Sequence, residues 1–256
     1  MTIRAGSLVL ALVLTASVAA QESTSLTRSE VAALKAKIVA VQAAMGGEPP
    51  GYVREEEDSF YLPTDFNPTR DGKYWPITSS VQMRFTDKGT VDSAANLEKA
   101  QADFQTRYLA AIASGNEAAI NRAMQEMTQI QTAAIAAASA PAAAKEDMRV
   151  SVQINMNPIV GIDPDAVLLE RPGVIALRKK DDPSGQSGEV TVYLDPVALA
   201  ATEELSKIEL RTAEDGVANR TGVFHIVIQL DGALADIESW AEAFDFPAML
   251  AVFDAR

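Results

Sequence analysis

The sequence predicts an α+β fold: an N-terminal helix and a helical hairpin come first, and a mixed or antiparallel C-terminal sheet with helices follows. Apolar residues recur at three- and four-residue steps through 31–45 and 97–134, which is typical of helices packed along one face. They alternate with polar residues through 81–85 and 150–156, which is typical of half-buried strands. A segment rich in proline and aromatic residues, 48–76, separates the first helix from the first strand.

The first helix is expected to begin after Thr27 and to end at Gly46-Gly47. Thr27 and Glu30 have the spacing of a capping box, in which each side chain accepts from the backbone N–H of the other residue. The helix places its apolar residues on one face, and we expect this face to dock on the body of the protein: Val31, Leu34, Ile38, Val41 and Met45.

The segment 48–76 holds five of the twelve prolines and six of the fifteen aromatic residues. Prolines at these intervals exclude a long helix or a central strand, so we expect an extended loop. An aromatic, acidic and proline-stiffened loop is suited to recognising a peptide, a sugar or a cationic ligand. The candidate contact residues are Tyr52, Phe60, Tyr61, Tyr74 and Trp75, with Glu55, Glu56, Glu57 and Asp58 tuning the charge. The alternative is that these aromatic residues seal the core between helices and sheet.

A helical hairpin is expected after a strand at 80–85. The first helix of the hairpin covers about 92–114 and ends at Gly115, and Asn116 can cap the second helix. So short a connection favours antiparallel neighbours. The two facing stripes are predicted to be Leu97, Ala100, Phe104, Tyr108 and Ala111, and Ile120, Met124, Met127, Ile130 and Ala134.

The second half is rich in strands. Residues 223–230 are apolar on nearly both faces, which predicts a central strand. From residue 190 onward the expected order is strand, helix, strand, strand, helix and strand, an order that fits a ferredoxin-like split βαβ layout. The elements of this half are expected at 150–156, 174–177, 190–194, 207–211, 223–230 and 249–253 for strands, and at 196–202 and 233–244 for helices.

Three regions are expected along the chain. Residues 1–20 resemble a cleaved signal peptide, with Arg4, an apolar run and a small-residue cleavage site at Val18-Ala19-Ala20. Residues 21–140 form the helical region with one strand and the loop 48–76, and residues 148–256 form an α+β domain. The apolar run is shorter than the ~20 residues of a membrane-spanning helix, so we expect a periplasmic or secreted protein with no membrane span.

The charge and the lack of cysteine narrow the function classes. The formal net charge is −13, and it becomes −14 when the expected signal peptide is removed, because Arg4 is its only charged residue. Such a chain is repelled by nucleic acid and anionic lipid, and it favours cationic ligands or basic partners. The absence of cysteine excludes disulfides, a thiolate nucleophile and a cysteine metal site.

No sequence motif predicts a cofactor or a metal. The alternating ligands Asp65, Asn67, Thr69 and Asp71 resemble a calcium loop, but the required glycine and glutamate positions do not fit, and Asx-turns explain the residues better. The single histidine, His225, lies in the expected central strand, where a packed side chain is the favoured interpretation.

The leading hypothesis is therefore an exported, soluble, non-catalytic binding or accessory protein of the bacterial periplasm, with an unknown protein, peptide or small-molecule partner. One alternative is an exported carboxylate-dependent hydrolase acting on sugar or peptide, with Glu56 or Asp58 as acid or base. The other alternative is a helical assembly protein, in which the stripe from Val31 to Met45 packs on another subunit.

Overall fold

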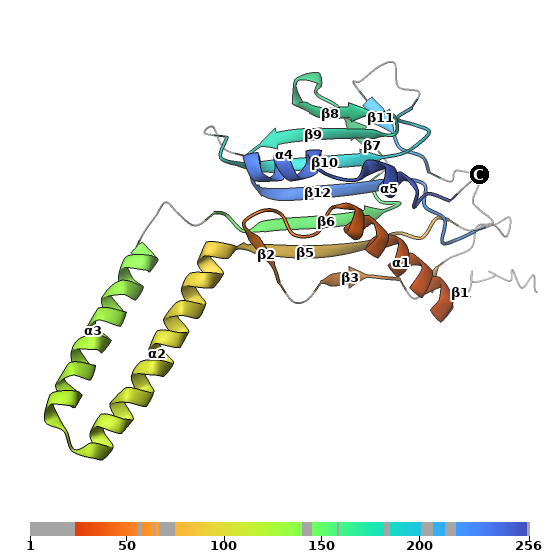
Figure 1. Ribbon diagram of the computed structural model, residues 1–256. Helices are drawn as coiled ribbons and strands as arrows, with labels where there is room; N and C mark the ends of the chain where they lie inside the picture. The colour runs from red at the N-terminus through yellow and green to blue at the C-terminus, as the bar shows by residue number, and fades with distance from the viewer. Residues whose placement is uncertain are drawn as a thin grey trace, which may run out of the picture.

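The computed structural model describes residues 24–55, 58–63, 65–66, 75–139, 145–157, 159–181, 185–200, 207–212 and 219–254. An eight-stranded antiparallel sheet has the strand order β2-β5-β6-β12-β10-β9-β8, and β3 also pairs with β5 (Figure 1). Its strands are β2 (Tyr52–Arg54), β3 (Ser59–Tyr61), β5 (Ser79–Asp87), β6 (Met148–Ile154), β8 (Val167–Arg171), β9 (Val174–Lys180), β10 (Ser187–Leu194) and β12 (Ile226–Ala233).

Helices and two small strand pairs complete the fold, which confirms the predicted α+β class. Helices α1, α4 and α5 lie on one face of the sheet (Figure 1). The helices are α1 (Arg28–Ala44), α2 (Lys88–Ser114), α3 (Glu117–Ser139), α4 (Leu234–Glu242), α5 (Phe246–Leu250) and the 3-10 turn η1 (Pro164–Ala166). The small pairs are β1 (Thr24–Ser25) with β4 (Asp65–Phe66), and β7 (Ile159–Gly161) with β11 (Lys207–Glu209).

The main core lies between the sheet and these helices. The register places Val81 opposite Val152, and Val152 opposite Ile228, so one face of three adjacent strands is continuously apolar. Phe85 on this face meets Trp240 of α4 edge to face, with the ring centroids 5.4 Å apart. Helix α1 begins at the capping box of Thr27 and Glu30, as predicted, and buries Leu34, Ile38 and Val41.

Strand β12 is central, as its apolar sequence predicts, because it pairs with β6 on one side and β10 on the other. Ile226, Ile228 and Leu230 face the main core. Val227 faces the other side, where the β7–β11 pair covers it with Val160 and Ile208. This second small core explains why β12 is apolar on both faces.

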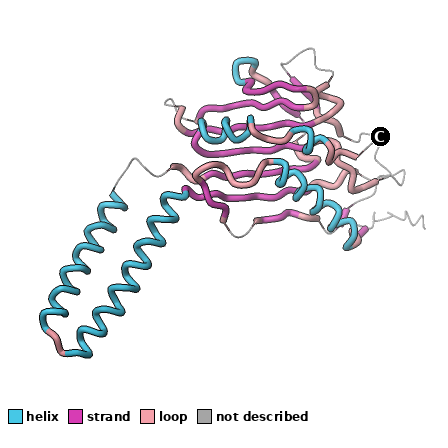
Figure 2. Tube along the Cα trace, viewed as in Figure 1, coloured by secondary structure: helices cyan, strands magenta, loops and turns pink. Residues whose placement is uncertain are grey.

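Helices α2 and α3 form the predicted hairpin, which projects away from the sheet (Figures 1 and 2). The Asp87 carboxylate caps α2 by accepting from the Thr90 N–H at 2.9 Å. Gly115 ends α2 with a φ of 65°, a left-handed conformation that favours glycine. Asn116 Oδ1 then accepts from the Ala119 N–H at 3.1 Å. Below, the α2–α3 hairpin, residues 88–139, is called the arm.

Three parts of the expected second half are wrong. Of the helix expected at 196–202, the described residues 196–200 form turns instead. The final strand predicted at 249–253 does not form, because Asp245 caps a helix at the Ala248 N–H (3.0 Å) and Pro247 suits its first turn. Strand β11 pairs with β7 in a separate sheet, and β10 and β12 are direct antiparallel neighbours. The described residues therefore do not have the ferredoxin-like order. None of the helices in the described ranges combines the length and apolar character needed to cross a membrane.

Candidate functional site

Tyr52, the first residue predicted for contact, is buried in β2. Its phenol donates to Asp236 Oδ2 of α4 at 2.9 Å, and the Lys145 ammonium lies 5.3 Å from the ring centre. Burial, and after it the hydrogen bond to Asp236, raises the pKa of the Tyr52 phenol well above its usual value. Tyr52 therefore joins β2 to α4 and does not present a contact surface.

Phe60 and Asp58, which were also predicted for contact, are held by interactions within the protein. Phe60 packs against the main core, with the Lys35 ammonium 4.6 Å from the ring centre. Asp58 pairs with the Arg54 guanidinium, whose Nε is 3.0 Å from Oδ1, and it accepts from the Gln42 amide at 3.1 Å. These interactions give Asp58 a structural role.

The remaining predicted residues do not converge on one site within the described ranges. Glu55 is exposed, and its N–H donates to the Arg84 carbonyl at 3.0 Å. Tyr61 is 56% exposed and Trp75 is 51% exposed. Tyr74, Glu56 and Glu57 lie outside the described residues. The core-sealing alternative thus fits Tyr52 and Phe60, whereas Tyr61 and Trp75 are available for contact.

Tyr61 borders the polar face of the sheet, which lies opposite the face covered by α1, α4 and α5. Its partner in the register is Ser80, and Ser80 in turn lies opposite Gln153. The Gln153 amide nitrogen donates to Gln229 Oε1 at 2.8 Å, and its oxygen accepts from Asn157 Nδ2 at 2.8 Å. Gln153 is itself buried beside Val227, its partner in the register, so this network satisfies its amide group where the β7–β11 pair covers the sheet.

A row of five charged residues crosses the same face, one from each of five adjacent strands. In order the row is Arg84, Arg149, Asp231, Glu189 and Lys179. Burial, followed by the charge of Glu189 on the neighbouring strand, raises the pKa of the Asp231 carboxyl. Residues directly opposite in an antiparallel pair have Cβ atoms about 4.5–5.5 Å apart, so this is a pair of neighbouring carboxylates.

His225 belongs to a buried structural cluster. Its Nδ1 lies 2.7 Å from the Arg211 carbonyl, and its Nε2 lies 2.9 Å from the Met156 carbonyl. Asp195 is fully buried and accepts from the Arg211 N–H and Nε, both at 2.7 Å, and from the N–H groups of two turn residues. Both histidine nitrogens thus meet backbone carbonyls, and the packed interpretation of His225 holds.

The arm has a seam between its two helices. Phe104 and Tyr108 stack within α2 with their centroids 5.6 Å apart, and Arg107 Nη2 donates to Glu126 Oε1 of α3 at 2.6 Å. The predicted α2 stripe is confirmed, since its members are all at least half-buried while their neighbours are exposed. The predicted α3 stripe is wrong at Met124, because Ala123 takes the buried position.

Large apolar side chains lie outside this seam and are exposed to solvent: Leu109 (65%), Ile112 (49%), Met124 (58%) and Ile135 (67%). When each helix is viewed along its axis from the N-terminus, Leu109 and Ile112 lie on the same rotational side of the seam in α2 as Met124 and Ile135 do in α3. Because the helices are antiparallel, equal rotational displacement turns both stripes to the same side of the hairpin. The arm therefore has one exposed apolar face.

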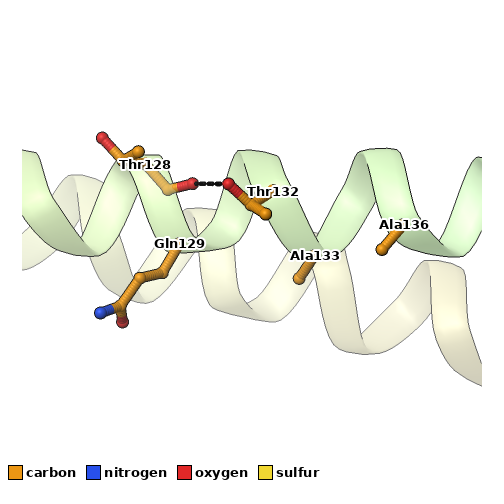
Figure 3. A pocket seen from close by; sticks show the side chains of 5 residues that line it. All are labelled: Thr128, Gln129, Thr132, Ala133 and Ala136. Carbon is orange, nitrogen blue, oxygen red and sulfur yellow. Dashed lines mark hydrogen bonds between the residues drawn. The ribbon is translucent and has the colours of Figure 1, made fainter.

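A shallow recess lies along α3 at the level between Met124 and Ile135, but it is turned to another side of the helix. It is lined by Thr128, Gln129, Thr132, Ala133 and Ala136, and small side chains leave the helix surface open (Figure 3). The Thr132 hydroxyl donates to the Thr128 carbonyl at 2.8 Å and so turns toward its own helix. The recess is therefore separate from the exposed apolar side chains Met124 and Ile135.

Comparisons with known proteins do not assign the chain to a family or a known fold. No family model matches the chain, and no curated protein and no solved structure is similar to it. Within the ranges that the structure describes, no three histidine or acidic side chains are grouped as a metal site. The exposed face of the arm was not predicted from the sequence, although Leu109 and Ile112 lie outside the expected stripe and could have indicated it.

Proposed function

We propose that the chain is an exported, non-catalytic accessory protein of the bacterial periplasm that docks on a partner through the arm. The observation that carries this proposal is the exposed apolar face formed by Leu109, Ile112, Met124 and Ile135 on a hairpin that projects from the sheet. Exposed large apolar side chains gathered on one side of an element favour an interaction site, because monomeric proteins rarely expose large apolar patches.

The arm is not needed to build the body. Neither of the two apolar core clusters includes a residue from 88–139. The exposed side chains also have a thermodynamic cost, since full burial of each would contribute about 1.5–3 kcal/mol. A partner that covers the face would recover part of this free energy, whereas folding of the sheet alone does not.

Export is supported by the N-terminal pattern and by composition. Residues 1–20 have the signal-peptide pattern, and an acidic chain without cysteine suits the periplasm. N-terminal sequencing of the protein from its native source tests this part. We expect the first residue to be Gln21, and an intact Met1 on protein recovered from the cytoplasm would contradict export.

Site-specific photo-crosslinking in cells tests the docking function. A photoreactive phenylalanine analogue is placed at Leu109 or Ile135, and a control carries it at Val39, an exposed residue of α1. We expect the same discrete covalent product from both arm positions and not from Val39. Absence of a discrete product at either arm position, or an equal product at Val39, would overturn docking through the arm.

A hydrolase is the second candidate function, but the carboxylates that support it differ from those predicted from the sequence. Asp58 is held by Arg54 and Gln42, so the neighbouring carboxylates Glu189 and Asp231 are the better acid–base pair. Purified protein would then cleave a glycoside or peptide substrate, and Asp231→Asn would abolish the cleavage. Equal rates for the wild type and Asp231→Asn across such substrates would exclude this role for the pair.

A further inference from the structure

We infer that the partner of the arm is a second copy of this chain, and that two arms pack into a four-helix bundle. This inference rests on the proposed docking function and names the occupant of the exposed face. Three features of the arm lead to it: its charge, its size, and the placement of its exposed apolar side chains on one side.

The charge of the molecule is unevenly distributed. The chain carries a formal net charge of −13, but the arm holds four basic and five acidic residues and so contributes only −1. The rest of the chain carries −12. Two copies that approached through their bodies would repel each other, whereas two arms meet with almost no net repulsion. The arm is therefore the surface best suited to self-association.

The size of the arm meets what a stable dimer needs. Helix α3 has 23 residues, which corresponds to a length of about 35 Å. A face two helices wide measures about 20 Å across, so contact along it would bury roughly 700 Å² on each copy. The total of roughly 1,400 Å² lies within the range of specific, stable interfaces.

The apolar residues are placed for a two-fold contact. Met124 and Ile135 are 11 residues apart, which is close to three full helical turns, so they lie on the same side of α3. A two-fold axis midway between them lays α3 of the second copy antiparallel on α3, so that Met124 of each copy meets Ile135 of the other. Leu109, level with Met124 across the seam, extends the contact.

Sedimentation velocity on the full-length mature protein tests the inference. Over about 1–100 µM, a range that covers ordinary homodimer affinities, we expect the wild type to shift from monomer to dimer. The double variant Leu109→Glu/Met124→Glu should raise the dimer Kd at least about 100-fold, because two charges enter an apolar interface. Val39→Glu, which adds a charge to an exposed apolar position of α1, should leave the Kd unchanged.

A covalent test uses the absence of cysteine from the chain. Met124→Cys/Ile135→Cys places a thiol of each copy opposite a thiol of the other in the expected antiparallel pairing, and mild oxidation should give a disulfide-linked dimer. Val39→Cys is the matched control and should stay monomeric under the same oxidation. Circular dichroism of every variant must show the helix content of the wild type, so that a loss of dimer reports the interface.

The outcomes separate this inference from the proposed function. A wild type that stays monomeric across the concentration range, with no covalent dimer from Met124→Cys/Ile135→Cys, overturns self-association. If crosslinking from Leu109 then gives a discrete product whose mass is not that of two copies, docking through the arm stands with another partner. If crosslinking also gives no product, both proposals fail.

Discussion

Removal of the arm is expected to leave the sheet folded. The arm is inserted between β5 and β6, and these strands are antiparallel neighbours in which Phe85 lies opposite Met148. Replacing residues 88–144 with a four-residue turn rich in asparagine and glycine would therefore convert β5 and β6 into an ordinary β-hairpin. Asp87 and Lys145 are kept, because Asp87 pairs with Tyr52 in the register and Lys145 pairs with Asp236.

The expected change in stability is small because few contacts are lost. No residue of either core cluster is removed, and the losses at the junction are the capping bond between Asp87 and Thr90 and the bond from the Lys88 N–H to the Gly51 carbonyl at 2.9 Å. The cap stabilises α2, which is itself deleted, so its loss does not weaken the sheet. We expect the free energy of unfolding to change by no more than about 1–2 kcal/mol, the usual size of a junction effect.

Urea unfolding followed by tryptophan fluorescence measures this change, because Trp240 is buried in the core that is retained. The m-value should fall, since a smaller chain exposes less surface when it unfolds. The same variant should sediment as a monomer and lose the crosslinks of the arm. A loss of cooperative unfolding, or a loss of stability above about 4 kcal/mol, would show that the sheet depends on the arm and would refute the reasoning.

Three further predictions concern polar contacts of the body. Asp195→Ala should cost about 3–5 kcal/mol in urea unfolding, because it leaves the Arg211 guanidinium and buried N–H groups unpaired, and a cost below about 1 kcal/mol would contradict it. The hydrogen bond from Arg220 holds the pKa of Glu30 at about 2, below its ordinary 4.5, so this pair stabilises the fold above pH 4.5 and is lost as pH falls through about 2. The free energy of unfolding of the wild type should then be about 1 kcal/mol higher than that of Glu30→Gln at neutral pH, and this difference should vanish near pH 2. Tyr52→Phe should cost about 1 kcal/mol, and because the pKa of Tyr52 is raised, the wild type should lose stability as pH rises above 10.0, a loss that Tyr52→Phe should not share.

The ends of helices could be predicted from the sequence, because the residues that form each end lie within a few positions of one another. The capping box of Thr27 and Glu30 needs only four residues, and the stop at Gly115 needs only the left-handed conformation that glycine adopts freely. The central position of β12 could also be predicted, because a strand buried on both faces must be apolar at odd and even positions.

Other features depend on contacts between distant segments and could not be predicted. The acidic run that ends at Asp58 resembled a charged binding loop, but Arg54 and Gln42 hold this carboxylate in place. Tyr52 is predicted for contact because it lies in an aromatic, acidic and proline-rich segment, yet Asp236, far along the chain, satisfies its hydroxyl inside the protein. Neither partner can be identified from sequence spacing, since the fold alone brings it near.

The exposure of Met124 also could not be predicted from the sequence, and it supports the inference that the arm packs in a four-helix bundle. A helix with one neighbour needs a narrow apolar seam, whereas a helix inside a bundle needs a wider stripe that faces two neighbours. Helix α2 has the seam around Phe104 and Tyr108, and beside it Leu109 and Ile112. The second stripe has no helix to pack on within the arm. The sequence of a four-helix bundle requires a stripe of this width, so Leu109 and Ile112, together with Met124, favour a second hairpin against the exposed face.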